Sequence, residues 1–373
     1  MYYTILKILF LSLLLSIFTS YGAAGNGKPG DPDNPSDTLE ESKGFMALPL
    51  FYYTPDTRFA FGALGVTYFR LKGQEGTTRL SHAKLMSNYT LNNQLDVYGS
   101  WDIFLPDEKY YIKGVLRYRN FPDRFYGVGN MSEPVYENFD YSYFTFKKLV
   151  MRKVRPNLFL GGDFHFNYAY GFDLEQDKLL STGRISGHDG GLTSGLGLVG
   201  IYDSRDNVVY PSKGVFFEAS SYFYGGYLGS DFNYTNLNLV FSTYKKVFNR
   251  GVLAANVTGN FNHGDIPFTS MAFAGSDEIL RGYSKNRYRD NNFLGTQVEY
   301  RMPVIGRFGI ACFAGIGDVF ENISDVGLNT LKYSYGGGIR YTINEKEHLN
   351  IRLDYGIGRG GNNGFYIMVS EAF

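Results

Sequence analysis

The feature that most restricts the fold of this chain is a regular alternation of apolar and polar side chains over long stretches. In 348–358, the odd positions from Leu349 to Ile357 are aliphatic or aromatic, and the even positions between them are Asn350, Arg352, Asp354 and Gly356. Successive side chains of a strand point to opposite faces, so this stretch predicts a strand with one apolar and one polar face. Its length favours a membrane strand, which needs about 9–11 residues, over a soluble strand of about five or six.

The same pattern recurs along the chain, and the connections between the segments alternate between short and long. The predicted strands are 44–53, 58–72, 78–90, 94–104, 109–119, 138–154, 158–171, 190–203, 213–224, 231–248, 251–263, 292–303, 307–319, 332–343, 347–358 and 364–373. Short periplasmic turns and longer outer loops are typical of outer-membrane barrels, and an even strand count places both ends on the periplasmic side. We therefore predict an all-β fold, a transmembrane antiparallel β-barrel of 16 strands over 44–373, in the outer membrane of a Gram-negative bacterium.

The residues before the first predicted strand divide into two segments. Residues 1–24 contain Lys7, an apolar run too short for a comfortable membrane helix, and small residues up to Ala24, which predicts a secretory signal peptide. Residues 25–43 are poor in apolar side chains and rich in Pro, Asp, Ser and Gly, so we expect a disordered periplasmic tail.

The charge balance and the cysteine content argue against a nucleic-acid partner, an internal disulfide framework and a Cys-based zinc site. Lys and Arg together number 36, and Asp and Glu also number 36, which argues against a nucleic-acid partner. The single cysteine, Cys312, excludes an internal disulfide framework and a Cys-based zinc site. No cofactor is predicted.

The last segment of the chain predicts an assembly signal. Phe365, Ile367, Val369 and Phe373 fall on one face of the predicted strand 364–373, which ends in an aromatic residue. This pattern resembles the signal by which outer-membrane barrels are recognised, so the barrel-assembly machinery is an expected partner during biogenesis, together with outer-membrane lipid.

Three stretches in the C-terminal half resemble the BamA/TamA superfamily of outer-membrane barrels. They are Tyr202–Asn207 with Tyr210–Gly214, then Leu280-Arg281-Gly282-Tyr283, and then Val298–Pro303 continuing to Phe313–Phe320. Each is weak alone, but the three occur in the family's order. Because only 25–43 precedes the first predicted strand, the chain resembles a barrel-only member without periplasmic POTRA modules.

The resemblance implies a loop that folds into the lumen between strands 11 and 12 and is held by Arg281, Gly282 and Tyr283. Parity places Glu299 on the luminal face, where it is the expected partner of Arg281. The family's second acidic partner would fall at Gly315; Asp318 is nearby, and a strand end or bulge could turn it inward.

The resemblance also implies a structural periplasmic turn between strands eight and nine. Its motif consists of Asp203, Arg205, Asp206, Pro211 and Gly214. The alternative is an ordinary polar turn in solvent.

Two functions are compatible with this sequence. The first is protein insertion, translocation or membrane perturbation with a separately encoded periplasmic partner, and the alternative is a passive pore for small polar solutes. An enzyme is not predicted, because neither Asp163 with His165 nor His188 with Asp189 is accompanied by a nucleophile motif.

Overall fold

The computed structural model describes residues 43–54, 58–71, 78, 81–130, 136–208, 210–248, 250–285, 287–344, 349–369 and 371–373. The predicted signal peptide, 1–24, and the predicted tail, 25–43, lie outside these residues except for Lys43, which begins the first strand. Within the described part of the chain, no helix is both long enough and apolar enough to cross a bilayer.

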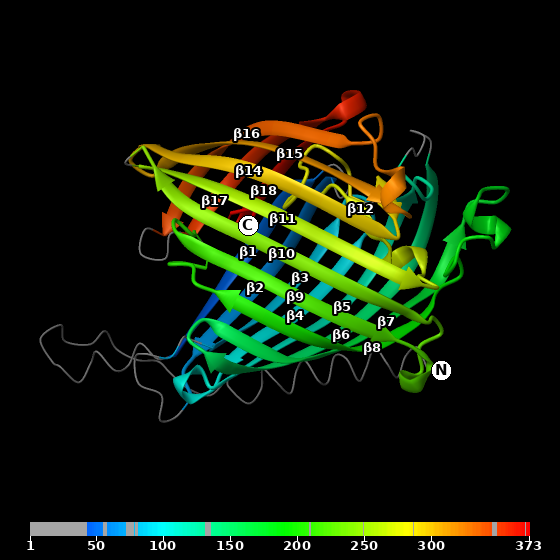
Figure 1. Cartoon of the computed structure of the whole chain (residues 1–373), viewed down its shortest axis with the longest axis horizontal. Coiled ribbons are helices and arrows are strands. Elements are labelled where there is room, and N and C mark those ends of the chain that lie inside the picture. The colour runs from blue at the N-terminus through cyan, green and yellow to red at the C-terminus, as the bar shows by residue number, and fades with distance from the viewer. Residues whose placement is uncertain are drawn as a thin grey trace, which may run out of the picture. The chain divides into compact units, whose positions relative to one another are not determined.

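Sixteen strands pair in chain order to form one antiparallel sheet (Figure 1). Each strand is hydrogen-bonded to the strand that precedes or follows it in this order, so the class all-β and antiparallel is confirmed. The strands are β1 (Lys43–Thr54), β2 (Arg58–Phe69), β3 (Ser81–Thr90), β4 (Leu95–Phe104), β5 (Tyr110–Phe125), β6 (Glu137–Arg155), β7 (Leu158–Leu174), β8 (Gly191–Asp203), β9 (Gly214–Tyr224), β10 (Tyr234–Val247), β11 (Gly251–Gly264), β14 (Asn292–Ile305), β15 (Phe308–Phe320), β16 (Lys332–Asn344), β17 (Leu349–Gly358) and β18 (Asn363–Val369).

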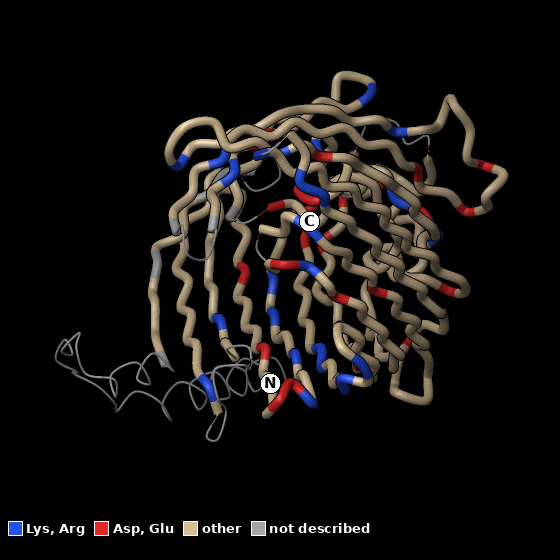
Figure 2. The backbone as a smooth tube through the Cα atoms, turned by 60° about the vertical axis from the view of Figure 1, so that its left-hand side comes forward, with Lys and Arg blue, Asp and Glu red and all other residues tan. Residues whose placement is uncertain are grey.

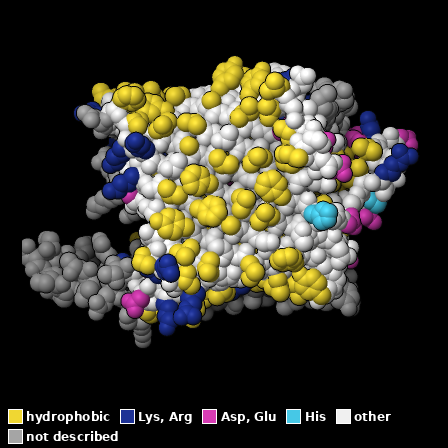
Figure 3. Space-filling view, in the orientation of Figure 1, with side chains coloured by type: hydrophobic (Ala, Val, Ile, Leu, Met, Phe, Trp, Pro, Cys, Tyr) yellow, Lys and Arg dark blue, Asp and Glu magenta, His cyan; other side chains and the backbone are white. Residues whose placement is uncertain are grey.

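The two faces of this sheet differ in polarity, as the alternation predicts. In β14, Leu294 and Val298 are 43% and 45% exposed, whereas Gln297 and Glu299 between and beside them are buried. We call the face that carries Glu299 the inner face and the opposite one the outer face. Figure 3 shows apolar and aromatic side chains spread over the outer face. Since a water-soluble sheet buries its apolar face, this inverted arrangement suits an apolar solvent.

The first and last strands of the sheet lie side by side. Cα atoms of β1 and β18 come within 8 Å of one another, but in the described residues no ladder of hydrogen bonds pairs these two strands. We call this junction the seam. β18 has only seven residues, whereas β1 has twelve. The edges that face each other at the seam are therefore unequal in length.

The predicted strand 364–373 extends too far, because the regular strand ends at Val369. The Glu371 carboxylate accepts a hydrogen bond from Arg340 Nε at 2.8 Å on the inner face. The ring of Phe373 packs near that of Tyr244 in β10, with 6.4 Å between centroids. A buried ion pair and an aromatic contact thus draw the last residues away from the direction of the strand. Charged positions of both signs surround this end of the chain in Figure 2.

The connection between β11 and β14 carries its own small structure. It contains the 3-10 turn η5 (Phe268–Ser270) and the short strands β12 (Ala272–Ala274) and β13 (Tyr288–Asp290), which pair with each other. We call residues 265–291 the inner loop. Its apolar cluster includes Leu280 and Tyr283 together with Phe293 of β14 and Val319 of β15. The inner loop therefore packs on the inner face through a small core of its own.

Candidate functional site

The tip of the inner loop, Leu280–Tyr283, lies against the backbone of β17. A Cβ atom added to Gly282 would come within 2.9 Å of backbone atoms of Gly356 and Gly358, and one added to Gly356 would come within 2.5 Å of the Arg281 carbonyl. Gly282 also has a φ of 120°, which side chains rarely adopt. Glycine is therefore needed on both sides of this contact.

Arg281 is completely buried beneath this contact and is paired with two carboxylates. Its Nη1 donates to Asp354 Oδ2 at 2.6 Å, and its Nη2 donates to Glu299 Oε2. The guanidinium carbon lies 3.5 Å from the centroid of the Phe313 ring. Hydrogen bonds to carboxylates combined with stacking on an aromatic ring suit arginine and not lysine. The geometry can hold the loop in one position.

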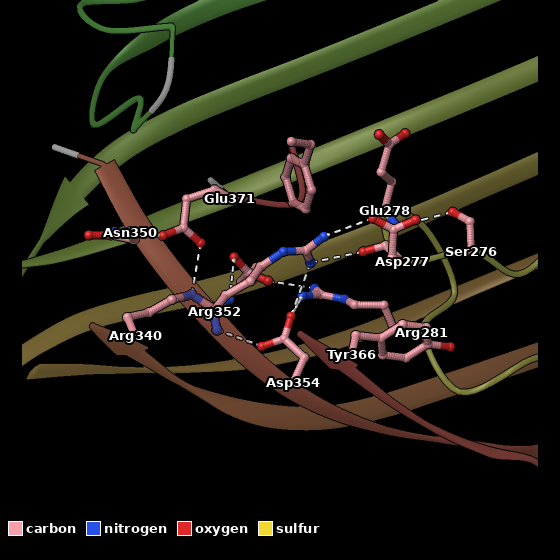
Figure 4. Close-up of polar contacts among 12 residues, drawn as sticks. Ser276, Asp277, Glu278, Arg281, Arg340, Asn350, Arg352, Asp354, Tyr366 and Glu371 are labelled. Atoms are coloured by element: carbon pink, nitrogen blue, oxygen red, sulfur yellow. Dashed lines mark hydrogen bonds and ion pairs between the residues drawn. The ribbon is translucent and has the colours of Figure 1, made fainter. Parts of the chain in front are cut away.

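The two carboxylates join Arg281 to further arginines of the inner face (Figure 4). Glu299 Oε1 accepts from Arg301 Nε at 2.6 Å. Asp354 accepts from Arg340 Nη1 at 2.5 Å and from Arg352 Nη1 at 3.1 Å. Arg352 in turn donates to the carbonyl and the carboxylate of Asp277 in the inner loop. We call this set the arginine network. Because each buried charge meets a charge of opposite sign, the network avoids the large cost of a buried unpaired ion.

Two tyrosines complete the attachment of the loop tip. The Gly282 amide donates to Tyr366 Oη of β18 at 3.0 Å. Tyr283 Oη donates to the Tyr333 carbonyl at 2.8 Å and accepts from the Arg359 amide at 2.8 Å. Burial raises the pKa of Tyr283 to about 12, so this phenol keeps its proton at neutral pH. The loop tip is thus hydrogen-bonded to strands on both sides of β17.

The structure places Asp318 away from Arg281, contrary to the position suggested from the sequence. Asp318 pairs with Lys332 Nζ and accepts from Thr330 Oγ1. Asp354 takes the second acidic position instead. A Cβ atom at Gly315 would come within 3.2 Å of Leu280 Cδ2. A larger side chain in that position would require Leu280 and its neighbours to shift.

Sequence reasoning did not identify Asp354 or Glu371 as members of the network. Asp354 lies on the polar face of its predicted strand, and this position is the sequence feature that indicates a side chain on the inner face. Regular alternation along 364–373 would give Glu371 the same face as Phe373, yet its carboxylate binds Arg340 and lies 3.6 Å from Arg301. Only the end of β18 at Val369 turns it inward.

The motif between β8 and β9 forms a compact hydrogen-bonded turn. Arg205 donates from Nε and Nη2 to the two oxygens of Asp203, both at 2.9 Å. Asp206 accepts from the amides of Ser212 and Lys213 at 2.8 and 3.1 Å. Gly214 has a φ of 105°, and a Cβ atom there would lie 2.3 Å from the Ser204 carbonyl oxygen. These contacts fit a structural role for the turn.

Pro211 is buried in the same turn. Lacking an amide hydrogen, it needs no hydrogen-bond partner there, and its fixed φ limits the conformations of the connection.

His165 and Asp163 belong to a polar cluster on the inner face, formed by side chains of β7 and β9. His165 Nε2 lies 3.0 Å from Asp163 Oδ2, and its Nδ1 lies 2.8 Å from Tyr224 Oη. Tyr222 Oη also donates to Asp163 at 3.0 Å. His188 lies 3.7 Å from Asp189 in the loop after β7. In the described part of the chain, no group of three or more His, Cys, Asp or Glu is placed to hold a metal.

Comparisons with known proteins agree with this architecture. The model of the Omp85 superfamily domain matches residues 70–373. No curated protein matches the chain. Among solved structures, BamA from Haemophilus ducreyi lacking POTRA domains 1–3 is similar with a TM-score of 0.59 and 13% identity, over 88% of this chain and 70% of that one.

Two structures of CdiB are similar to the same extent. CdiB from Acinetobacter baumannii has a TM-score of 0.57 and 11% identity over 87% of this chain, and CdiB from Escherichia coli has 0.59 and 8% over 92%. This chain spans 59% and 64% of the length of those two chains. At these identities the likeness concerns the fold.

Proposed function

Because the chain belongs to the Omp85 superfamily, we propose that it is a Gram-negative outer-membrane β-barrel that assists the insertion or translocation of proteins. In this proposal the sixteen paired strands close into a transmembrane barrel, the inner face lines its lumen, and the inner loop folds into that lumen. The outer membrane is the proposed location, because an apolar outer face and paired strands suit hydrocarbon. A periplasmic partner encoded separately would deliver the client protein.

The seam is the observation that carries this proposal. Backbone groups along the facing edges of β1 and β18 are not joined by a ladder in the described residues. An edge of this kind can pair with an incoming strand through main-chain hydrogen bonds, which is the basis of β-augmentation. A client strand would add at β1, where twelve residues are available, without first breaking a ladder between β1 and β18.

The inner loop has a complementary role in this proposal. By anchoring Arg281 to Glu299 and Asp354, it fills part of the inner cavity and limits free diffusion through the barrel. The ion pairs are buried, so solvent and salt weaken them less than they weaken surface pairs. The loop would therefore restrict leakage through the barrel while the seam is available.

Crosslinking the seam tests this function directly. In a Cys312→Ser background, one cysteine in β1 and one in β18 are introduced at pairs found by scanning for disulfide formation. Cells depleted of the wild-type protein are complemented with each pair, with and without reductant, and the outer-membrane and secreted proteomes are measured. Specific client proteins should disappear under oxidising conditions and return with reductant. Single-cysteine variants serve as matched controls.

An unchanged set of client proteins in the crosslinked, folded barrel would contradict the proposal. A general loss of outer-membrane proteins in the single-cysteine controls would point to a folding defect and not to the seam.

A passive pore for small polar solutes is the alternative, and the polar wall formed by β10 and β11 favours it. Asn236 Nδ2 donates to Asn262 Oδ1 at 2.7 Å, and Asn260 Nδ2 donates to Asn238 Oδ1 at 2.6 Å. Such amides can line an aqueous path. Single-channel recording separates the two functions. A large steady current in the wild type favours the pore, whereas a current that appears only in Arg281→Ala favours the translocation function.

A further inference from the structure

The first two strands of the sheet are apolar on both faces. A strand of a membrane barrel ordinarily alternates between apolar residues that face lipid and polar residues that face the lumen. From 44 to 51 in β1 and from 59 to 69 in β2, the sequence contains no Asp, Glu, Lys, Arg, His, Asn or Gln. The charged residues of these two strands, Lys43 and Arg58, are their first residues. A charge at the end of a membrane strand costs little, so both faces of this hairpin suit hydrocarbon.

The hydrogen-bonded ladders show which side chains of β1 and β2 face inward. Residues directly opposite each other in an antiparallel ladder lie on the same face of the sheet. The row of opposed residues that contains His165 of the inner face runs back from β7 to β2 through Lys147, Val115, Ser100, Lys84 and Val66. Met46 of β1 lies opposite Val66 and completes the row. Val66 and Met46 therefore face inward.

The apolar inner face of this hairpin is only partly covered. Met46 is 43% exposed and Tyr68 is 39% exposed. Elsewhere, large apolar residues on the inner face are packed away, since Val199 of β8 and Phe313 of β15 are each 5% exposed. The inner face of β1 and β2 thus leaves apolar surface open, which is unfavourable against water and favourable against hydrocarbon.

The strands on the other side of the seam have the opposite character. Arg340 of β16 and Arg352 and Asp354 of β17 are buried in the arginine network. The Gly282 amide ties the inner loop to Tyr366 of β18. If these strands left the wall, their ions would meet acyl chains, which is costly for any ionised side chain. This side of the seam is therefore fixed by charge.

Charged side chains on the inner face begin again at β3. Lys84 is exposed on that face, and His82 Nε2 lies 3.1 Å from Asp102 Oδ2 of β4. In the described residues, the ladder between β2 and β3 is the one that joins the β1–β2 hairpin to the rest of the sheet. The hairpin can turn about this ladder without carrying an inner-face charge into the bilayer.

We propose that the β1–β2 hairpin is the movable side of the seam and that its inner face binds lipid acyl chains when the seam opens, while β16–β18 stay in place. The inference deepens the proposed function and rests on it for the closed barrel and the opening seam. Lipid is the occupant because, at the edge of β1, the inner face continues directly into the apolar outer face.

Contact with lipid can be measured on the purified protein without a client. If the seam crosslinks left all client proteins unchanged while lipid contact was found, the proposed function would fail and the lipid-binding surface would remain. If client proteins depended on the seam but no lipid contact was found, only the inference about the hairpin would fail.

Quenching of a single tryptophan by brominated lipid is the test. Trp101→Phe removes the native tryptophan, and Val66→Trp or Val115→Trp then introduces one on the inner face. Both valines are half-buried and lie in the same row of opposed residues, so position 115 is the matched control. In nanodiscs with brominated acyl chains, the tryptophan at 66 should be quenched at least about twofold more than that at 115, because quenching reports the open population. Equal quenching would overturn the proposal.

A second reporter covers the case in which Val66→Trp does not fold. Heat-dependent migration on SDS gels verifies the folding of each variant. Met46→Trp places the reporter on β1 itself, and its quenching is compared with the same control at position 115. Quenching of the Met46→Trp reporter no greater than that of the control would overturn the proposal in the same way.

A pair of glutamate variants tests the energetic argument. Val66→Glu places a carboxylate opposite Lys84, and Val115→Glu places one opposite Lys147, so the intact wall accommodates both. Only Val66→Glu would carry a charge into the bilayer when the hairpin moves. With Met46→Trp as the reporter, Val66→Glu should lower quenching by brominated lipid about twofold or more, and Val115→Glu should leave it unchanged. An equal effect of the two variants, or no effect of Val66→Glu, would overturn the proposal.

Discussion

At the scale of the residue, Arg281 is the side chain on which the position of the inner loop depends most. Replacing it with alanine removes one cation from a buried network in which Glu299 keeps Arg301 and Asp354 keeps Arg340 and Arg352. Removal of one partner of a buried ion pair costs about 3–5 kcal/mol when the other charge is left uncompensated, so this is the upper bound. We expect Arg281→Ala to lower the midpoint of thermal unfolding in detergent. Arg184→Ala, in an exposed loop, is the matched control. If both variants unfolded at the same temperature, Arg281 would not be an anchor.

The pH dependence of the turn between β8 and β9 follows from Asp206. Burial alone would raise its pKa, but hydrogen bonds from Ser212 and Lys213 outweigh this effect and lower the pKa below 3.8. A carboxylate whose pKa is lowered by folding stabilises the fold above its unfolded pKa, and this stabilisation is lost as pH falls through the folded pKa. We expect Asp206→Asn to cost about 1 kcal/mol near neutral pH, since Asp206 is largely exposed.

The difference between wild type and Asp206→Asn should shrink when unfolding is measured at about pH 3. A difference that stayed constant over the whole pH range would show that the charge of Asp206 is not what stabilises the turn.

Parity along the strand predicted one acidic partner of Arg281 and missed the other. Glu299 was assigned to the inner face from the alternation of β14 alone, and the structure places its carboxylate against Arg281. Asp354 had the correct parity too, but parity gives the face and not the depth at which a loop meets a strand. The position along β17 at which the loop tip makes contact depends on the close backbone approach of Gly282 to Gly356 and Gly358, which alternation does not reveal.

At the scale of the element, the inner loop is held by a backbone contact as much as by charge. Gly282→Ala would place a methyl group within 2.9 Å of the β17 backbone at a φ of 120°. We expect the tip to leave β17, at a cost of about 1–3 kcal/mol for the backbone conformation alone. Limited proteolysis should then cut within 265–291. Gly327→Ala, where a Cβ atom meets nothing within 4 Å, should leave the digestion pattern unchanged.

Resistance to protease in Gly282→Ala would mean that the tip tolerates a side chain, and the backbone contact would then contribute little to holding the loop.

The strands were predicted well where alternation is long, and less well at their ends. The predicted strand 138–154 corresponds to β6, Glu137–Arg155, and the predicted strand 292–303 corresponds to β14, Asn292–Ile305. β5 continues to Phe125, beyond the predicted 119, and there Phe125 packs with Phe139 of β6 and Phe268 of the inner loop. Contacts between segments far apart in the sequence determine where such a strand ends, and the local alternation of side chains carries no information about these contacts.

At the scale of the whole molecule, the resemblance noted from three short stretches is confirmed by the family match over 70–373. The alternation predicted the antiparallel class, and the order of the motifs predicted the family. The seam could not be predicted in the same way, because it depends on how the first and last strands meet after the sheet has curled.

The seam predicts uneven stability around the sheet. In the described residues, the amides of β1 and β18 that face the seam are not held in a ladder, whereas β6 and β7, which are 19 and 17 residues long, are each paired with a neighbour on both sides. Hydrogen–deuterium exchange of the protein in detergent should therefore be fastest, among the strands, in β1 and β18, and slow in β6 and β7. β10 and β11 serve as internal controls of ordinary length. Uniform protection of all strands would show that the seam is closed in solution.

The bond from the Gly282 amide to Tyr366 joins the inner loop to β18, next to the seam. A strand that displaces β18 from β17 must also break this bond and pull on Gly282, which is adjacent to Arg281. By thermodynamic linkage, loosening the loop must favour separation of β18 by the same free energy with which that separation loosens the loop. In the proposed function, the loop tip would therefore couple the separation of β18 from β17 to the release of the inner loop.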